Sequence, residues 1–192
     1  MRPFRSLTAR AAVLDRPDVD TDQIIPKQFL KRIDRTGFGE FLIYDWRRDP
    51  DFELNQPGAR GAKILLAGSN FGCGSSREHA AWALQDYGFE VVVAPSFGDI
   101  FFSNATQIGL VPVHLPEVKE VMAAAGDGSE VTVDLQAQTV AAGSSTWEFS
   151  MDPFVRNCLL DGLDAIALTL QHEEDIAAFE TRTPARITTT AL

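Results

Sequence analysis

A glycine-rich segment with two adjacent serines and an arginine contains the residues best suited to chemistry. It reads GSNFGCGSSREH over residues 68–79 and follows an apolar run at residues 64–67. We expect a strand to end before it and a helix to begin within it, capped by the hydroxyl of Ser75 or Ser76. The unpaired N–H groups and aligned peptide dipoles of a helix N-terminus stabilise a carboxylate or an alkoxide. The segment is therefore predicted to bind an anion.

The loop does not match the sequence patterns of other functional glycine-rich loops. The lysine of the phosphate-binding pattern GxxxxGKS/T is absent, and the glycine spacing does not match the GxGxxG pattern of dinucleotide-binding folds. The GxSxG pattern of serine hydrolases is absent as well. A simpler alternative stays open on the loop alone, in which the two serines only cap a helix and Arg77 is a solvated side chain of its first turn.

The composition is that of one ordinary globular domain. The chain has 192 residues, of which 45% are hydrophobic and 23% charged. Its formal charge of −10 argues against nucleic acid as a partner, because phosphate binding requires a basic surface. There is no apolar stretch of the roughly 20 residues that a membrane span needs, and no secretion signal. We expect a cytoplasmic protein without a membrane or nucleic-acid partner.

The potential metal ligands are few and scattered. Cys73 and Cys158 lie far apart, so we expect both to be reduced. A 4Fe-4S cluster takes four thiolates, or three with one open iron, which is more than this chain has. His114 and His172 have no companions at ligand spacing, and residues 20–22 are interpreted as a turn. We therefore expect no metal or cofactor on this chain, and any cluster must come from another chain.

Strands and helices alternate around the glycine-rich segment. The pattern predicts strands at residues 4–14, 64–67, 91–93 and 110–113, with helices at 77–84, 97–108 and 117–125. Such alternation favours a parallel α/β layer. Two alternating stretches at 131–135 and 146–149 predict a small antiparallel element, and closing helices are predicted at 153–163 and 173–181. The predicted fold class is α/β with a mostly parallel central sheet, in one domain over residues 1–182 followed by a flexible tail at 183–192.

Long motifs in this order resemble a known family. They are GSNFGCGSSREHA at residues 68–80, TDQIIPKQFL at 21–30, APSFGDIFFSNATQIGLVPV at 94–113 and LDGLDAIALTLQHEEDIAAFE at 160–180. Together they resemble the swivelling domain of the aconitase superfamily, and within it the small subunits of bacterial 3-isopropylmalate dehydratases. The resemblance covers nearly the whole chain. It implies a β/β/α swivelling fold and a large-subunit partner that carries a 4Fe-4S cluster.

The resemblance also implies an activity and roles for three residues. The reaction would be a dehydration and rehydration of a small dicarboxylic hydroxy acid, exchanging 2-isopropylmalate and 3-isopropylmalate in leucine biosynthesis. Ser75 would act as an alkoxide-like base, while Ser76 and Arg77 would line the substrate site. A serine needs an electropositive setting for this role, which the helix N-terminus, the amides of residues 72–74 and the guanidinium would supply. Arg77 can also hold a carboxylate with two parallel hydrogen bonds.

Weaker candidates surround the predicted site. Lys27, Arg32 and Arg35 could supply positive charge to a second substrate carboxylate, or they could be ordinary surface bases. Apolar side chains of the same region could contact the isopropyl group or pack in the core; these are Phe29, Leu30 and Phe38. His79 could orient the loop from one helical turn away, although a structural histidine is the simpler interpretation.

Three other functions stay open. The chain could be the small subunit of a sister hydro-lyase, such as homoaconitase or a methylmalate-type isomerase, because the shared loop contacts only the common malate part of the substrate. It could be a binding module that kept the fold and lost catalysis. A self-sufficient hydrolase that uses Ser75 as its nucleophile is the third.

Overall fold

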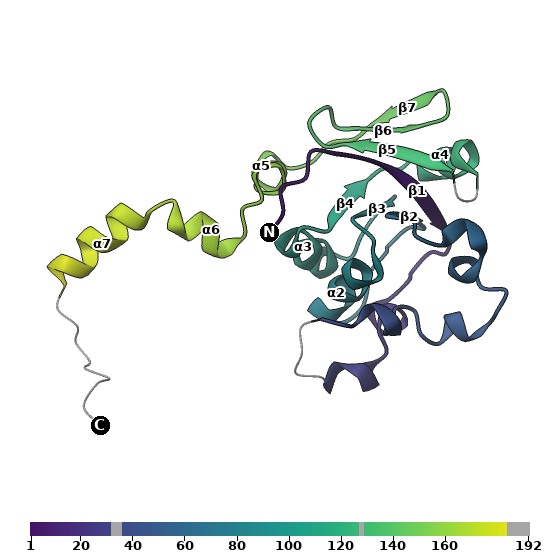
Figure 1. The fold of residues 1–192 in the computed structure, drawn as a ribbon, viewed down its shortest axis with the longest axis horizontal. Coiled ribbons are helices and arrows are strands. Elements are labelled where there is room, and N and C mark those ends of the chain that lie inside the picture. The colour runs from purple at the N-terminus through teal and green to yellow at the C-terminus, as the bar shows by residue number, and fades with distance from the viewer. Residues whose placement is uncertain (32–35, 127–128, 184–192) are drawn as a thin grey trace.

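The structure is a computed structural model that describes residues 1–31, 36–126 and 129–183. Within these residues, seven strands form one curled sheet in the order β4-β3-β2-β1-β5-β6-β7 (Figure 1). The strands are β1 (Ser6–Leu14), β2 (Ile64–Ala67), β3 (Val91–Ala94), β4 (Val111–His114), β5 (Glu130–Asp134), β6 (Thr139–Ala142) and β7 (Ser145–Glu148). The half from β1 to β4 is parallel, and β1 also pairs antiparallel with β5. The predicted α/β class is confirmed, with the parallel and antiparallel parts joined through β1.

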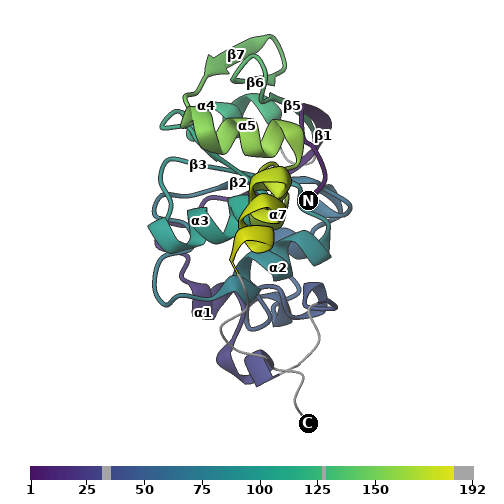
Figure 2. The ribbon, with the colours of Figure 1, turned by 90° about the vertical axis from the view of Figure 1, so that its left-hand side faces the viewer.

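Helices cover both faces of the parallel half. The α-helices are α1 (Thr21–Ile24), α2 (Glu78–Tyr87), α3 (Asp99–Ile108), α4 (Val118–Ala125), α5 (Pro153–Asp161), α6 (Ala165–Leu170) and α7 (Glu173–Arg182). Short 3-10 turns are η1 (Lys27–Lys31), η2 (Gly39–Phe41), η3 (Trp46–Arg48), η4 (Glu53–Asn55) and η5 (Pro57–Ala59). Figure 2 shows α2 and α3 on one side of the strands and α4 and α5 on the other. None of the helices in the described ranges is long and apolar enough to cross a membrane.

Alternate residues of the parallel strands face opposite sides of the sheet. Leu65 and Val92 pack in the apolar cluster that includes α2 and α3, while Leu66 and Val93 pack in the cluster that includes α4 and the antiparallel strands. Because side chains along a strand alternate in direction and both faces are covered, these strands are continuous apolar runs. Their parallel arrangement also sends the loops after β1, β2 and β3 out from the same edge of the sheet.

The antiparallel part contains a strand that the sequence pattern did not predict. The stretches at residues 131–135 and 146–149 do not pair with each other, because β6 lies between β5 and β7 and pairs with both. Gly143 has φ 58° in the two-residue connection between β6 and β7, where Ala142 lies opposite Ser145. A left-handed glycine suits such a tight hairpin turn.

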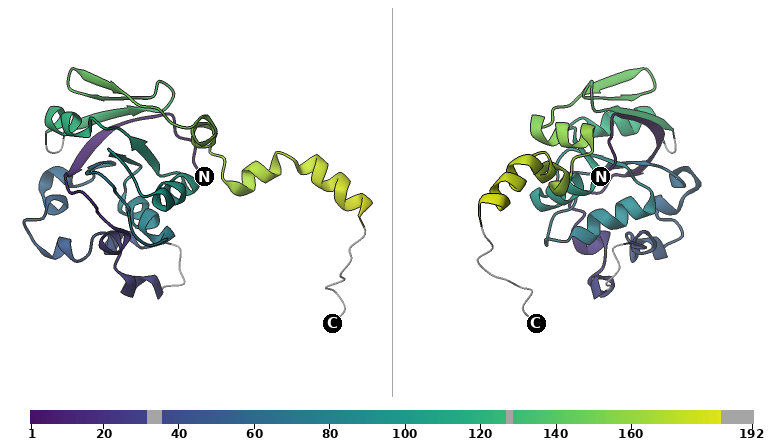
Figure 3. Two further views of the ribbon diagram at one scale, coloured as in Figure 1. Left: turned by 180° about the vertical axis from the view of Figure 1, so that it is seen from behind. Right: turned by 60° about the vertical axis from the view of Figure 1, so that its left-hand side comes forward.

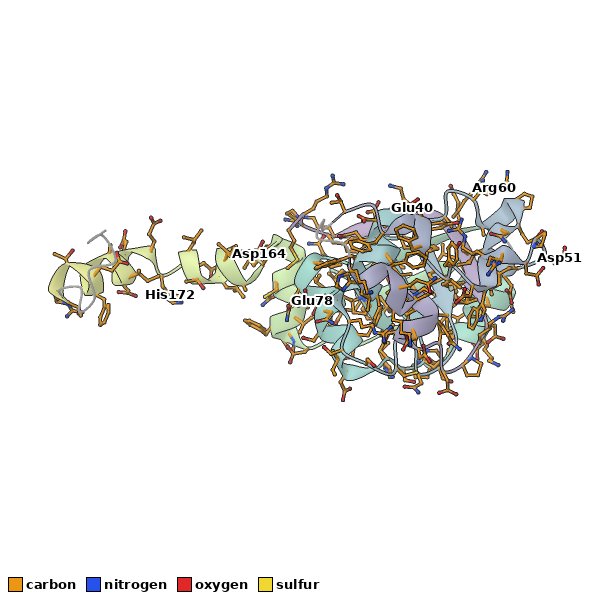
Figure 4. All side chains as sticks on the ribbon, turned by 90° about the horizontal axis from the view of Figure 1, so that it is seen from below. Glu40, Asp51, Arg60, Glu78, Asp164 and His172 are labelled. Atoms are coloured by element: carbon orange, nitrogen blue, oxygen red, sulfur yellow. The ribbon has the colours of Figure 1, made fainter. Side chains whose placement is uncertain are left out.

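Helices α6 and α7 form an arm that extends away from the sheet (Figures 1 and 3). All ten residues of α7 are exposed. Figure 4 shows His172 out on the arm and Asp164 at its base, where the N-terminal amino group of Met1 donates a hydrogen bond to the Asp164 carboxylate (3.0 Å). The predicted helix at 173–181 is confirmed, and α6 was not predicted. The single domain over 1–182 stays a prediction, and of the predicted tail only the first residue is described.

Candidate active site

The glycine-rich loop after β2 is hydrogen-bonded to the loop that follows β1. The backbone N–H of Gly72 donates to the carbonyl of Val19 (2.7 Å). In the opposite direction, the N–H of Thr21 donates to the carbonyl of Cys73 (2.9 Å). These bonds fix the middle of the glycine-rich loop against the segment that leads from β1 into α1. This is the carboxyl edge of the parallel strands, where ligands of open α/β sheets bind.

The same loop is hydrogen-bonded on its other side to the loop that follows β3. The N–H of Phe71 donates to the carbonyl of Ser96 (3.0 Å), and the N–H of Gly98 donates to the carbonyl of Phe71 (2.9 Å). The hydroxyl of Ser96 accepts a bond from the N–H of Asn70 (2.8 Å). The first half of the loop is thus held on two sides, which gives a firm base to the serines that follow.

Two glycines allow this close packing. A side chain at Gly68 would collide with the backbone carbonyl of Arg16, which passes directly against it. Gly72 has φ 73°, a left-handed conformation that favours glycine, and a Cβ there would collide with the ring of Phe101. Larger residues at either position would push the loop away from its neighbours.

Ser75 and Ser76 are exposed and keep their hydroxyls available. Within the described ranges neither hydroxyl makes a hydrogen bond, whereas the carbonyl of Ser75 accepts one from the hydroxyl of Thr21 (3.0 Å). The prediction that one of these serines caps the helix is wrong. Helix α2 begins at Glu78, and its N-cap is Arg77, which makes no side-chain capping bond. Because the chain is extended at Arg77, the serines precede the helix and are left free for another role.

Arg77 forms a two-bond ion pair with Asp22, a partner that the sequence analysis did not identify. Nη2 of Arg77 donates to Oδ2 of Asp22 (2.8 Å), and Nη1 donates to Oδ1. Nη1 also reaches the carbonyl of Ile25 (3.4 Å). The Arg77 side chain is 13% exposed, so this guanidinium is largely covered. No local pattern could have revealed the pair, because the two residues are 55 positions apart.

Helix α1 is stabilised by a capping box at its N-terminus. The carboxylate of Asp20 accepts a bond from the N–H of Gln23 (2.8 Å), and the side chain of Gln23 accepts one from the N–H of Asp20 (2.9 Å). This reciprocal capping box satisfies two N–H groups at the helix start. The interpretation of residues 20–22 as a turn is thus refined, because Asp20 caps a short helix that carries Asp22.

The surroundings of the loop are more acidic than predicted. Burial raises the pKa of the Cys73 thiol, and the carboxylates of Asp20 and Asp18 raise it further. A raised thiol pKa means that a negative charge is disfavoured at this position. The guanidinium of Arg77, next to the serines, is paired with the carboxylate of Asp22. The electropositive setting of Ser75 therefore stays a prediction, which the carboxylates beside Cys73 and the pairing of Arg77 with Asp22 weaken.

The other predicted substrate contacts are only partly described. Lys27 begins η1 and is exposed, with no ion pair among the described residues. Arg32 and Arg35 lie outside the residues that the structure describes. Phe38 is fully buried in the core, so it packs and cannot contact a substrate. Phe29 is partly buried and stacks on a neighbouring phenylalanine ring at 4.1 Å, and Leu30 packs partly against the same core.

His79 is a packing residue of helix α2. Its ring lies edge-on to Phe38, with 5.2 Å between centroids, and 4.7 Å from the ring of Trp82. Burial lowers the pKa of His79, the carboxylate of Glu78 opposes this shift, and the charge of Arg77 adds to it. This packing agrees with the preferred interpretation of His79 as a structural histidine, and the serines precede the helix, so helical spacing does not place His79 beside them.

Acid should destabilise the fold through His79. Because burial lowers its pKa in the folded state, the unfolded chain binds the proton more readily. The stabilising contribution is therefore present above the unfolded value of about 6.5 and is lost as the pH falls below it. We expect Tm to fall between about pH 7.5 and 5.5, and to fall less in His79→Gln. Equal slopes in thermal melts of the two proteins would contradict this, with the exposed His172→Gln as the control.

Among the described residues, neither the cysteines nor the other potential ligands suit a metal cluster. Cys73 and Cys158 are both free in the structure. Among the described residues there is no group of three or more His, Cys, Asp or Glu side chains that could hold a metal ion. Two thiols are also fewer than a 4Fe-4S cluster takes. Such a cluster does not fit the side chains of this chain.

The fold and the loop define a class of protein, the swivelling domains of the aconitase superfamily. Residues 1–118 match the family described as the aconitase C-terminal domain. Residues 120–153 match the family described as LeuD_N. Residues 166–186 match the family described as the C-terminal domain of the 3-isopropylmalate dehydratase small subunit, and this match includes α7.

Relatives that match over nearly the whole chain identify its family within this class. A 3-isopropylmalate dehydratase small subunit from Rubrobacter xylanophilus is 54% identical, covering 96% of each chain. One from Shouchella clausii is 53% identical, covering 95% of this chain and 97% of the relative. The crystal structure of a 3-isopropylmalate dehydratase (leuD) from Methanocaldococcus jannaschii superposes with a TM-score of 0.72 at 26% identity, covering 91% of this chain and 99% of the other. The chain belongs to the family of 3-isopropylmalate dehydratase small subunits, within the aconitase C-terminal domain family.

Proposed function

We propose that this chain supplies one half of the active site of a 3-isopropylmalate dehydratase, the hydro-lyase of leucine biosynthesis that interconverts 2-isopropylmalate and 3-isopropylmalate. The observation that carries the proposal is the pair of exposed serines beside Arg77, presented by a tightly held loop at the carboxyl edge of the sheet. The family membership of nearly the whole chain supports the same activity. The other half of the site would come from a large subunit.

In this proposal, Ser75 moves a proton and Arg77 binds the substrate. In the dehydration, the deprotonated Oγ of Ser75 takes the proton from the carbon next to a carboxylate, and in the rehydration the hydroxyl gives a proton back to the neighbouring carbon. Arg77 holds that carboxylate through two parallel hydrogen bonds, which limits the substrate to one orientation. The hydroxyl of Ser76 donates a hydrogen bond to a neighbouring substrate oxygen. The exposed positions of both serines leave room for a substrate held by a second protein.

The remaining charge and the cluster are assigned outside the described loop. Lys27, together with Arg32 and Arg35, would bind the second carboxylate of the substrate. The 4Fe-4S cluster is placed on the large subunit, since the side chains of this chain do not fit it. We also propose a cytoplasmic location, which the role in amino-acid biosynthesis and the free thiols support.

The direct test is an assay of the assembled enzyme. The chain is coexpressed with the large subunit of the same organism, purified without oxygen, and supplied in turn with 2-isopropylmalate, homocitrate and a methylmalate. We expect turnover of isopropylmalate well above that of the other two acids. Comparable or faster turnover of homocitrate or the methylmalate would assign the chain to a sister hydro-lyase. An assembled complex that turns over none of the three acids would favour the non-catalytic module.

A further inference from the structure

Some hydrogen-bond donors of Arg77 are bonded within the chain, and the others are free. A guanidinium has five N–H donors in a fixed plane. Asp22 accepts one N–H bond from each of the two terminal nitrogens, Nη1 and Nη2. The second N–H of Nη1 is directed to the carbonyl of Ile25, which lies 3.4 Å away. The two donors that remain are the N–H of Nε and the second N–H of Nη2. No hydrogen bond from Nε is present among the described residues, so one edge of the planar group, with two parallel donors, is free.

We propose that Asp22 is a positioning residue, which holds the far end of the Arg77 guanidinium so that its free Nε and Nη2 edge receives a substrate carboxylate. The inference rests on the proposed function of Arg77 as the carboxylate-binding residue. A carboxylate binds well to this edge, because two parallel N–H groups match its two oxygens. Asp22 and the substrate therefore occupy different edges and do not exclude each other.

Helix α1 has the rigidity that positioning requires. It is fixed by its capping box, and the side chains of Thr21 and Ile24 are buried beneath it. The hydroxyl of Thr21 bonds to the carbonyl of Ser75, while the adjacent Asp22 holds Arg77. Two neighbouring residues of α1 thus set the positions of both proposed functional groups. A shift of about an ångström in such groups is enough to weaken a reaction substantially.

The ion pair of Asp22 with Arg77 also offsets part of the positive charge of the site. The side chain of Asp22 is 52% exposed, and the Arg77 side chain that it holds is 13% exposed. A positive charge that is largely covered needs a partner, and a fixed carboxylate provides one without occupying the edge used for substrate. In the absence of Asp22, the long side chain of Arg77 would have several rotamers of similar energy.

The test is the substitution Asp22→Asn in the assembled two-subunit enzyme. Asparagine keeps the shape but loses the charge, and its amide nitrogen cannot accept a bond from Nη1 or Nη2. We expect KM for 2-isopropylmalate to rise about tenfold with a smaller fall in kcat, since ground-state and transition-state binding of the carboxylate are both weakened. A purely structural defect would instead reduce the amount of active enzyme and leave KM unchanged.

A double-mutant cycle shows whether Asp22 acts through Arg77. In an Arg77→Ala background, Asp22→Asn should change KM by less than about twofold, because the residue that it positions is already gone. The matched control is Glu53→Gln, which removes the charge from another carboxylate paired with an arginine, Arg16, through three hydrogen bonds of 3.0 to 3.1 Å. This control should leave KM unchanged.

Other outcomes would overturn the inference in distinguishable ways. If Arg77→Ala raises KM but Asp22→Asn does not, the role of Asp22 is refuted and that of Arg77 stands. If Asp22→Asn lowers KM, the carboxylate competes with substrate, and positioning is refuted. If Arg77→Ala leaves KM unchanged, the proposed carboxylate-binding function of Arg77 fails, and the inference about Asp22 fails with it.

Discussion

Ser75→Ala should lower kcat of the assembled enzyme by at least about a hundredfold, the lower range for loss of an acid–base group. The substitution removes one oxygen, which makes no hydrogen bond among the described residues. The bond from the Thr21 hydroxyl to the carbonyl of residue 75 does not depend on the Ser75 side chain and should persist. The loop should therefore keep its position, and the loss should appear in the chemical step. Steady-state kinetics on 2-isopropylmalate, with assembly of the two subunits checked by gel filtration, measure both effects.

Ser69→Ala is the matched control for this substitution. Ser69 is an exposed serine of the same glycine-rich loop, and its carbonyl also accepts a hydrogen bond, from the N–H of Asp18 (2.9 Å). It has no part in the proposed chemistry, so its removal should leave kcat and KM near those of the parent enzyme. A Ser75→Ala enzyme that keeps nearly full kcat would show that the base is another group. A loss of assembly in this variant would show that Ser75 has a structural role.

The parallel half of the fold could be predicted because its signals are local. Buried strands such as β2 and β3 are short apolar runs, and each following helix ends at a left-handed glycine, Gly88 after α2 and Gly109 after α3. The strand β6 is made of small residues with little alternation, so pairing with both neighbours determines it more than its own sequence does. The Gly143-Ser144 pair at its end was a usable signal for a tight hairpin.

The site could be located from the sequence, but its electrostatics could not. The glycines marked a loop between a strand and a helix, and this loop lies where expected. The exact start of the helix depends on the extended backbone at Arg77, which no residue type specifies. The pairing of Arg77 with Asp22 depends on the meeting of two distant loops at one sheet edge. Charge that is balanced by tertiary contacts cannot be read from a local motif.

The chain by itself should neither bind 2-isopropylmalate measurably nor turn it over. The glycine-rich loop has Asp18, Asp20 and Asp22 beside it, and the carboxylate of Asp22 offsets the charge of Arg77 although it leaves the Nε and Nη2 edge free of described partners. The whole chain has a formal charge of −10. A dicarboxylate approaching this surface gains little attraction, and repulsion between like charges opposes its binding. The carboxylates of Asp18 and Asp20 raise the pKa of the neighbouring Cys73 thiol, so we expect this edge to give little support to an alkoxide at Ser75 in the separate chain.

Addition of the purified large subunit should therefore restore activity rather than increase an existing one. A second protein with cationic groups facing this edge would both attract the substrate and favour the alkoxide of Ser75. Titration of the large subunit into the chain, with calorimetry for substrate binding and an anaerobic assay for turnover, measures the two effects separately. Activity should rise from the background in proportion to the complex formed and stop at saturation. Turnover by the chain before any addition would refute the division of the site between two proteins, because one acidic surface would then suffice to bind the substrate and activate the base.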